Sequence, residues 1–253
     1  MGSAMLAGWL ARGLPKSSVW VIDPHPSDWL KAQGIQLNVD LPAAPAIVLV
    51  AVKPQMMGDA LPTLQAMGNG KTVFVSVAAG TTIATFEKTL GAKTPIVRAM
   101  PNTPAAISQG ITAIVGNDNV GAQGMDEAEE LLSAVGDVVR LDEEAQIDAV
   151  TGVSGSGPAY VFHMIETMAA GGVAQGLSPE LALQLATATV AGAGALAKAS
   201  DEDPTQLRKN VTSPNGTTQA ALDVLMDAEN GFPALLKRAV AAAADRSREL
   251  SRD

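Results

Sequence analysis

The chain has 253 residues, of which 47% are hydrophobic and 17% charged, and its formal net charge is −9. This length and composition predict a folded protein of more than one domain, and the acidic balance argues against nucleic acid or an anionic membrane surface as a partner. The sequence has no cysteine and only two histidines, His25 and His163, far apart. Disulfides and thiolate catalysis are therefore excluded, and we predict no metal site.

The first ten residues have a helical pattern that begins at Gly2, with no strand before it. In dinucleotide-binding folds, a strand and the first two glycines of G-x-G-x-x-G precede such a helix. Gly2 therefore corresponds to the third glycine, and we expect the native chain to begin upstream of Met1 with the missing first strand. Asp23, which ends the next apolar run, fits the acidic position that binds a ribose hydroxyl.

Short apolar runs alternate with helical patterns up to about residue 145. Strands are predicted at 19–22, 46–50, 72–77 and 96–98, and helices at 54–67, 81–90 and 121–135. This alternation predicts a Rossmann-like, doubly wound parallel sheet over residues 1–148. The strand signal stops beyond about 150.

Residues 149–253 are predicted to form an all-α domain. One helix should span 179–199 after the capping residue Ser178, a second should start at 216–217, and a third should follow Pro233 and end near Leu250. These helices are rich in alanine and glycine and have few bulky side chains, so we expect them to pack against a second subunit. A helical bundle within one chain is equally compatible with the composition.

Three segments follow predicted strands, at the edge where open α/β sheets bind ligands. They are Ala51-Val52-Lys53-Pro54, Ala78-Ala79-Gly80 and Arg98-Ala99-Met100-Pro101-Asn102-Thr103-Pro104. Glycine and proline also punctuate strand ends for purely structural reasons, which is the alternative for each segment taken alone.

A fourth segment precedes the helix that starts at 216–217. It reads Val211-Thr212-Ser213-Pro214-Asn215-Gly216-Thr217-Thr218. Free backbone N–H groups at a helix start bind carboxylates or phosphates, so this segment is a candidate anion site. An ordinary capped helix is the alternative.

Taken together, these segments resemble pyrroline-5-carboxylate reductase. The resemblance also includes Val153-Ser154-Gly155-Ser156-Gly157-Pro158-Ala159-Tyr160 and covers nearly the whole chain. Two features depart from the family pattern: Asn215 replaces the first glycine of Ser-Pro-Gly-Gly, and the first strand is missing. Asparagine tolerates left-handed backbone, so the first departure is mild.

The resemblance implies reduction of L-1-pyrroline-5-carboxylate to L-proline by hydride transfer from NADPH or NADH, the last step of proline biosynthesis. It implies that Thr218 hydrogen-bonds the ring nitrogen as the catalytic residue. The implied substrate-binding residues are Val211, Ser213, Pro214, Gly216 and Thr217. The implied cofactor-binding residues are Gly2, Ser3, Asp23, Ala51, Val52, Lys53, Pro54, Met100, Pro101 and Asn102.

The resemblance further implies a homo-oligomer built from dimers by the helical domain. No signal peptide opens the chain, and uncharged stretches such as 149–165 are interrupted by glycine and proline, so we expect a cytoplasmic protein without a membrane span. Asp23 favours NADH, whereas the family commonly uses NADPH. His163 is expected in a core or an interface and His25 in an exposed loop.

Three other functions remain open. A 3-hydroxyacid dehydrogenase should carry a lysine on the interdomain helix, but no Lys or Arg occurs between Thr151 and Lys198. A coenzyme F420-linked reductase has no use for the 211–218 segment. A nucleotide sensor that binds ligands without turnover is the alternative outside catalysis.

Overall fold

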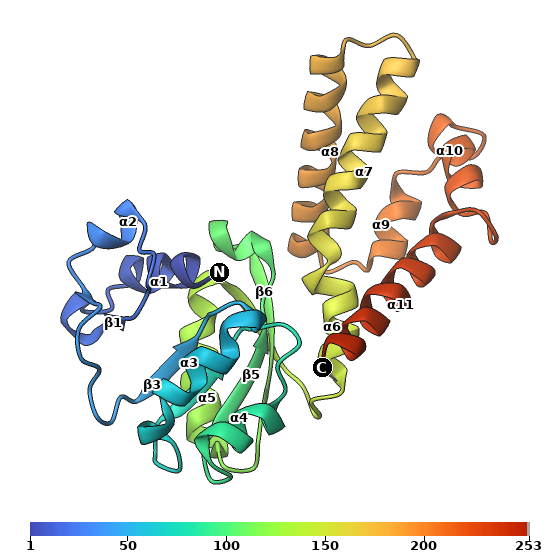
Figure 1. Cartoon of the computed structure of the whole chain (residues 1–253). Helices are drawn as coiled ribbons and strands as arrows, with labels where there is room; N and C mark the ends of the chain where they lie inside the picture. The colour runs from blue at the N-terminus through green and yellow to red at the C-terminus, as the bar shows by residue number, and fades with distance from the viewer. Residues whose placement is uncertain (252–253) are drawn as a thin grey trace. The chain divides into compact units, whose positions relative to one another are not determined.

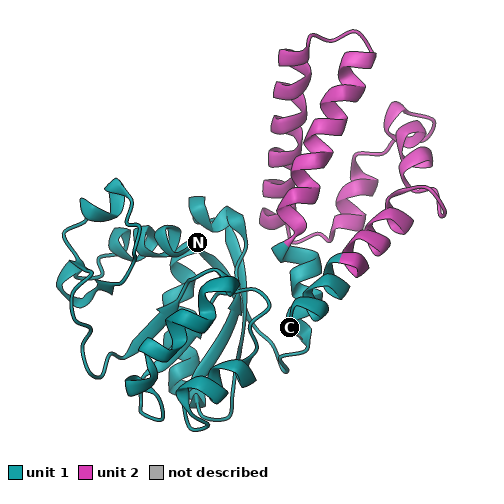
Figure 2. Ribbon diagram, in the orientation of Figure 1, with its two compact units in different colours: residues 1–155, 243–253 teal, residues 156–242 magenta. Residues whose placement is uncertain are grey.

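The computed structural model describes residues 1–251, which form two compact units (Figure 2). The first unit comprises Met1–Gly155 together with the C-terminal end of the chain from Ala243. The second unit is Ser156–Ala242. Each unit is described by itself below.

A five-stranded sheet forms the centre of the first unit (Figure 1). Its strands lie side by side in the order β3 (Ile47–Val50), β4 (Val73–Ser76), β5 (Ile96–Met100), β6 (Gly110–Gly116) and β7 (Gly136–Arg140). β3, β4 and β5 are parallel, as predicted. β6 and β7 lie beyond the predicted strands, and β6 is antiparallel to β5 and parallel to β7.

The segment before β3 forms a separate small sheet of β1 (Trp20–Val21) and β2 (Gln36–Leu37). Within the described residues β3 pairs with β4 alone, so its other edge is open. The Val73 N–H donates to the Ala46 carbonyl, and the Val77 N–H donates to the Val50 carbonyl. Backbone groups alternate between neighbours in a parallel pair, so those of Ile47 and Leu49 point to the open edge.

The helices of the first unit follow the predicted alternation. They are α1 (Gly2–Ala11), α2 (Asp28–Lys31), α3 (Met57–Thr63), α4 (Ile83–Leu90), α5 (Gly121–Leu132) and α6 (Gln146–Val150). Single 3-10 turns at Pro54–Met56, Gln65–Met67 and Ser133–Val135 extend α3 and α5 to the predicted limits. Thr82 starts α4 as its N-cap, because its hydroxyl accepts the Thr85 N–H.

The core lies on both faces of the sheet. Val75 belongs to one buried cluster with Met5 of α1 and Leu132 of α5. Its neighbour Phe74 belongs to the other cluster, with Phe86 of α4. Successive side chains of a strand point to opposite faces, so the continuous apolar run at 72–77 reflects burial on both sides.

The second unit is helical, as predicted. It contains α7 (Gly157–Ala174), α8 (Pro179–Ala199), α9 (Pro204–Asn210), α10 (Thr217–Leu225) and the first part of α11 (Phe232–Leu250). α8 begins at Ser178, whose hydroxyl accepts the Leu181 N–H. Asp227 fixes the turn before α11: its carboxylate accepts the N–H groups of Asn230 and Glu229, which lower its pKa below the usual value.

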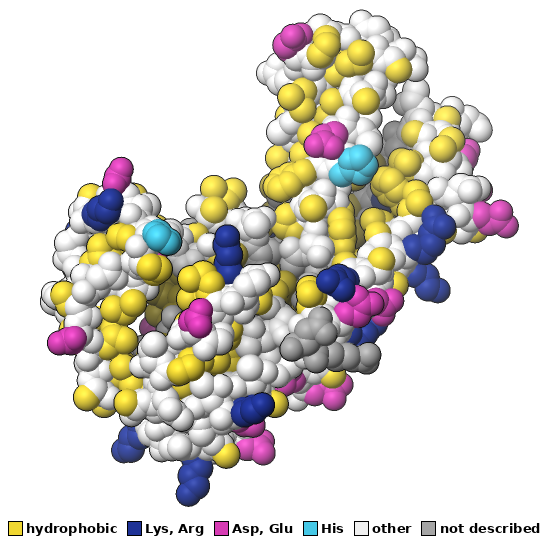
Figure 3. Space-filling view, viewed as in Figure 1, with side chains coloured by type: hydrophobic (Ala, Val, Ile, Leu, Met, Phe, Trp, Pro, Cys, Tyr) yellow, Lys and Arg dark blue, Asp and Glu magenta, His cyan; other side chains and the backbone are white. Residues whose placement is uncertain are grey.

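The helical unit has almost no core of its own. The buried hydrophobic residues between 156 and 242 are Ala182 and Ala186 alone. Large apolar side chains are exposed instead, and Figure 3 shows many of them over α7 and α8. The most exposed on these two helices are Phe162, Leu183, Leu185 and Leu196. By length and composition α8 is long and apolar enough to cross a membrane, with a mean hydropathy of 1.3. A single helix of this kind is only weak evidence for a membrane span.

Candidate functional site

The predicted pyrophosphate position lies at the start of α1. A side chain at Gly2 would approach the Cβ of Ala51 to 3.3 Å, so the helix begins against the carboxyl end of β3. No side chain caps α1, and the N–H groups of Gly2 and Ser3 have no partner within the described residues. A helix start with free N–H groups favours an anion. This arrangement therefore fits the phosphates of a dinucleotide.

Asp23 lies two residues beyond β1 and is held rigidly. Its N–H donates to the Asn38 side chain at 2.9 Å, its carbonyl accepts from the same side chain at 2.8 Å, and its Oδ1 accepts the His25 N–H at 2.8 Å. The nearby Ser27 hydroxyl caps α2, and Lys31 forms an ion pair with Asp28. This arrangement suits a ribose hydroxyl better than a phosphate.

The segment after β3 is exposed at Ala51, Lys53 and Pro54 and half-buried at Val52. Lys53 precedes the Pro54–Met56 turn and forms no ion pair within the described residues. Its ammonium group is therefore available to an anionic ligand.

The segment after β5 is partly taken up by the fold. Pro101 is buried, and the Oδ1 of Asn102 accepts the Ile111 N–H at 3.0 Å. The Asn102 side-chain oxygen therefore fixes the turn into β6. Met100 lies next to the π-helical turn Thr151–Gly155, because a Cβ on Gly155 would fall 2.5 Å from the Met100 Cε. Only glycine fits there without displacing Met100.

The candidate substrate segment, 211–218, contains hydroxyls without partners. Gly216 is the N-cap of α10, and no side chain caps that helix. The Thr212 hydroxyl donates to the Arg208 carbonyl at 2.6 Å, whereas no hydrogen bond joins the hydroxyls of Ser213, Thr217 or Thr218 to the described residues. The alternative of an ordinary side-chain cap is therefore wrong. These hydroxyls and the first N–H groups of α10 remain available to a ligand.

The loop geometry explains the residues before α10. Asn215 has a φ of 59°, so it adopts the left-handed conformation expected where the family has glycine. A Cβ on Gly216 would lie 2.3 Å from the Ser213 Oγ. Val211 and Pro214 are exposed on the same loop, Val211 by 65%.

An ion pair beside the candidate cofactor segments is not predicted from the sequence. Arg98 of β5 is almost fully buried, and its Nη1 donates to Glu144 Oε1 at 2.7 Å. The sequence feature that could have indicated this ion pair is the position of Arg98 inside an apolar strand, because a buried arginine requires a charged partner.

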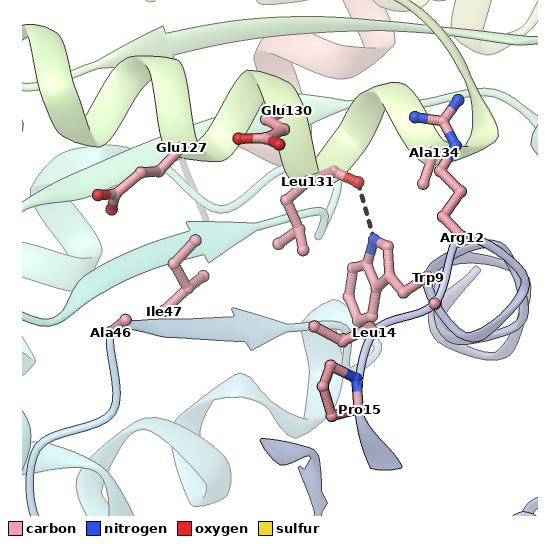
Figure 4. Close-up of a pocket in the computed structure, with 11 residues that line it drawn as sticks. Trp9, Arg12, Leu14, Pro15, Ala46, Ile47, Glu127, Glu130, Leu131 and Ala134 are labelled. Carbon is pink, nitrogen blue, oxygen red and sulfur yellow. Dashed lines mark hydrogen bonds between the residues drawn. The ribbon is translucent and has the colours of Figure 1, made fainter. Parts of the chain in front are cut away.

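Two hollows are lined by none of these residues. One, of about 560 Å³, is lined by Trp9, Arg12 and Leu14, by Ala46 and Ile47 at the start of β3, and by Glu127 and Glu130 of α5 (Figure 4). Trp9 closes one side by donating its indole N–H to the Leu131 carbonyl at 2.7 Å. This hollow adjoins the amino end of β3, opposite to the edge at which open sheets bind ligands.

The two histidines have no catalytic surroundings. His163 is exposed on α7, and its Nδ1 lies 3.1 Å from Glu166 Oε2. It does not lie in a core of the single chain, and its expected place in an interface stays a prediction. His25 is exposed, as expected. Within residues 1–251, no group of three or more His, Asp or Glu side chains could hold a metal ion.

Comparison with known proteins identifies relatives along the whole chain. Residues 144–250 match the family model for pyrroline-5-carboxylate reductase dimerisation. The pyrroline-5-carboxylate reductase of Pseudomonas aeruginosa is 41% identical over 99% of this chain and 93% of its own length.

Solved structures agree with this match. A pyrroline-5-carboxylate reductase from Coxiella burnetii has a TM-score of 0.93 at 33% identity, covering 99% of this chain and 94% of that one. The Plasmodium falciparum pyrroline carboxylate reductase with NADP bound has a TM-score of 0.85 at 29% identity, with the same coverage. The predicted fold class, a Rossmann-like α/β part followed by a helical C-terminal part, is thus confirmed.

Proposed function

Because this chain belongs to the pyrroline-5-carboxylate reductase family, we propose that the 211–218 segment recognises its substrate and that the carboxyl ends of β3 and β5 receive its cofactor. The chain reduces L-1-pyrroline-5-carboxylate to L-proline with NADPH or NADH, the last step of proline biosynthesis. When bound, the reduced nicotinamide supplies the hydride for the carbon of the C=N bond. The protein's task is to orient the ring and to stabilise charge.

The free groups at the start of α10 suit the two ends of the substrate. The carboxylate of the substrate binds the first N–H groups of α10 together with the hydroxyls of Ser213 and Thr217, since a helix start stabilises negative charge. Gly216 lets the loop pass close to Ser213, and Val211 and Pro214 supply apolar contact with the ring.

Thr218 holds the ring nitrogen. The imine nitrogen carries a proton, and this N–H group donates a hydrogen bond to the Thr218 hydroxyl oxygen. As the carbon is reduced, the electron pair of the C=N bond passes to the nitrogen, which keeps its proton. No side chain needs to supply or remove a proton in this step, in agreement with the absence of a histidine from the proposed site.

We assign the cofactor-binding residues by the hydrogen-bonding groups that the first unit leaves available to a ligand. Gly2 and Ser3 hold the pyrophosphate through their N–H groups, and Asp23 holds the adenosine ribose. Ala51, Val52, Lys53 and Pro54 line the central part of the cofactor. Met100, Pro101 and the backbone of Asn102 line its nicotinamide end.

The helical domain makes the homodimer, and we propose that higher oligomers are built from such dimers. The exposed apolar faces of α7 and α8 support this assembly. We further propose a cytoplasmic enzyme without nucleic-acid or membrane partners, supported by the net charge of −9. The division into a dinucleotide-binding domain, 1–148, and a helical domain, 149–253, remains part of the proposal.

The uncapped start of α10 with its free hydroxyls is the observation that carries the substrate assignment. The test follows the absorbance of reduced nicotinamide with the purified chain: its consumption with L-1-pyrroline-5-carboxylate, and its formation from the oxidised cofactor with a 3-hydroxyacid. We expect turnover with pyrroline-5-carboxylate alone. Ligand binding without turnover would instead support the sensor alternative.

A further inference from the structure

One carboxylate connects three segments around the proposed cofactor residues. Glu144 Oε1 accepts from Arg98 Nη1 at 2.7 Å and from the Ile83 N–H at 2.9 Å. The Arg98 side chain is 5% exposed and that of Glu144 is 30% exposed. A charge-assisted hydrogen bond is strong where the surroundings exclude much of the water. The two bonds to Glu144 therefore fix the three segments relative to one another.

Each segment leads to the carboxyl edge of the sheet or to the chain beyond it. Arg98 lies two residues before Met100 in β5. Ile83 is the first residue of α4 and follows the loop at the end of β4. Glu144 lies two residues before α6, which continues into the π-helical turn whose Gly155 lies against the Met100 side chain. Met100 is therefore held from two sides, through β5 and through the turn.

The electrostatics of this junction also favour a fixed arrangement. Glu144 neutralises the buried guanidinium and places a negative charge at the start of α4, where the helix dipole favours it. The Thr82 hydroxyl already caps α4 through the Thr85 N–H, so Glu144 is not required to start the helix. Its second bond serves to tie the β4–α4 loop to β5.

We propose that Glu144 is a positioning residue for the nicotinamide cofactor, which it serves through Arg98 and Ile83 without touching the cofactor itself. This inference rests on the proposed function, in which Met100 lines the nicotinamide end. A loop that is fixed before the cofactor binds loses less conformational freedom on binding. Loss of the Glu144 charge should therefore weaken cofactor binding while leaving the substrate segment in the other unit unchanged.

The test compares Glu144→Gln with Glu143→Gln. Glutamine keeps the size of Glu144 and one oxygen acceptor, so the variant should fold. The adjacent Glu143 is exposed, and its side chain forms no hydrogen bond to any residue of the described part of the chain. For Glu144→Gln we expect about a tenfold rise in the Kd for reduced nicotinamide, measured by fluorescence, with the KM for pyrroline-5-carboxylate within about twofold. Glu143→Gln should match the unsubstituted chain in both.

Two further measurements separate positioning from general stability. Amide exchange at Ile83 should accelerate in Glu144→Gln without cofactor, whereas amides of the central strand β4 should keep their rates. Arg98→Lys, which keeps the charge but loses the planar fork, should bind cofactor more weakly than the unsubstituted chain and more tightly than Arg98→Met. An unchanged Kd in Glu144→Gln would overturn the proposal.

A lower melting temperature together with similar fold increases in the cofactor Kd and the substrate KM would also overturn it, because these changes would indicate a purely structural role. Failure of the proposed function has a different signature. In that case the unsubstituted chain itself would not turn over pyrroline-5-carboxylate, whereas failure of the positioning role leaves an active parent enzyme and an unaffected variant.

Discussion

Three hydroxyl side chains, those of Ser213, Thr217 and Thr218, have no partner within the described residues and surround an uncapped helix start. Threonine and serine near a helix start usually accept a backbone N–H, as Ser178 does for α8 and Thr82 for α4. Hydroxyls that omit this bond keep their hydrogen-bonding capacity for another molecule. The segment before α10 thus differs from the starts of α4 and α8, because its hydroxyl groups do not cap the helix and stay available to another molecule.

The first prediction concerns Thr218. Thr218→Ala should lower kcat by roughly tenfold to a thousandfold, the range for loss of one positioned hydrogen bond to a reacting polar centre. Thr218→Ser keeps the hydroxyl and should retain most of the activity. Thr205→Ala removes an exposed threonine from the first turn of the neighbouring helix α9 and should have no effect. Steady-state kinetics of the three variants checks this, and unchanged kcat in Thr218→Ala would remove Thr218 from the mechanism.

The second prediction concerns cofactor choice at Asp23. The carboxylate accepts the His25 N–H, the Ser27 hydroxyl is taken up as a helix cap, and Lys31 is paired with Asp28. No free cation of this loop is therefore placed to hold a 2′-phosphate, and we expect usable activity with NADH and only modest discrimination. The measurement is kcat/KM with each cofactor. A preference for NADPH beyond about a hundredfold, or about 2.7 kcal/mol, would show that Asp23 does not face the ribose.

At the scale of elements, the sequence predicts best the segments that are buried on both faces or that begin with a clear capping residue. β4 is buried on both faces, and its run of β-branched and aromatic residues predicts a strand within a residue at each end. α8 agrees with its predicted bounds because Ser178 and Pro179 mark its start through local chemistry. Signals of this kind depend on neighbours in the sequence alone.

The reversal at β6 depends on long-range pairing, which no local pattern contains. The run from Gly110 to Gly116 is apolar enough to indicate a strand, but its direction is set by the turn before it. There Asn102 accepts the Ile111 N–H and Ser108 takes a left-handed φ of 56°. The Arg98–Glu144 pair escapes prediction for the same reason, because 46 residues separate its partners.

The third prediction concerns the open edge of β3. Backbone amides of Val48 and Val50 face β4, whereas those of Ile47 and Leu49 face the unpaired edge. Amide exchange in the chain of residues 1–253 should therefore be at least tenfold slower at Val48 and Val50 than at Ile47 and Leu49. The measurement is native-state hydrogen exchange by NMR. Equal protection at all four residues would show that another strand pairs with this edge in solution.

At the scale of the whole molecule, the contrast between the cores of the two units supports the proposed assembly. The three buried clusters all consist of residues from the first unit, and the helical unit buries two alanines. The abundance of alanine and glycine in its sequence leads us to expect packing against a second subunit, although the composition alone is equally compatible with a bundle within one chain. A family model for dimerisation covers the same helices. An apolar groove on α8, lined by Leu183, Thr187 and Ala191 among others, lies on the exposed surface of this helix.

The last prediction is that the helical unit makes an obligate homodimer that buries well over about 2,000 Å², as permanent interfaces do. Leu185 is 49% exposed on α8, so Leu185→Glu would place a charge in that interface. We expect this variant to sediment as a monomer or to aggregate, and to lose activity. Gln65→Glu adds the same charge to an exposed turn of the first unit and should remain a dimer. Analytical ultracentrifugation at micromolar concentration with a parallel activity assay decides the matter. A stable, active monomer of the unsubstituted chain would contradict the prediction, because helices without a core of their own would then have to fold without a partner.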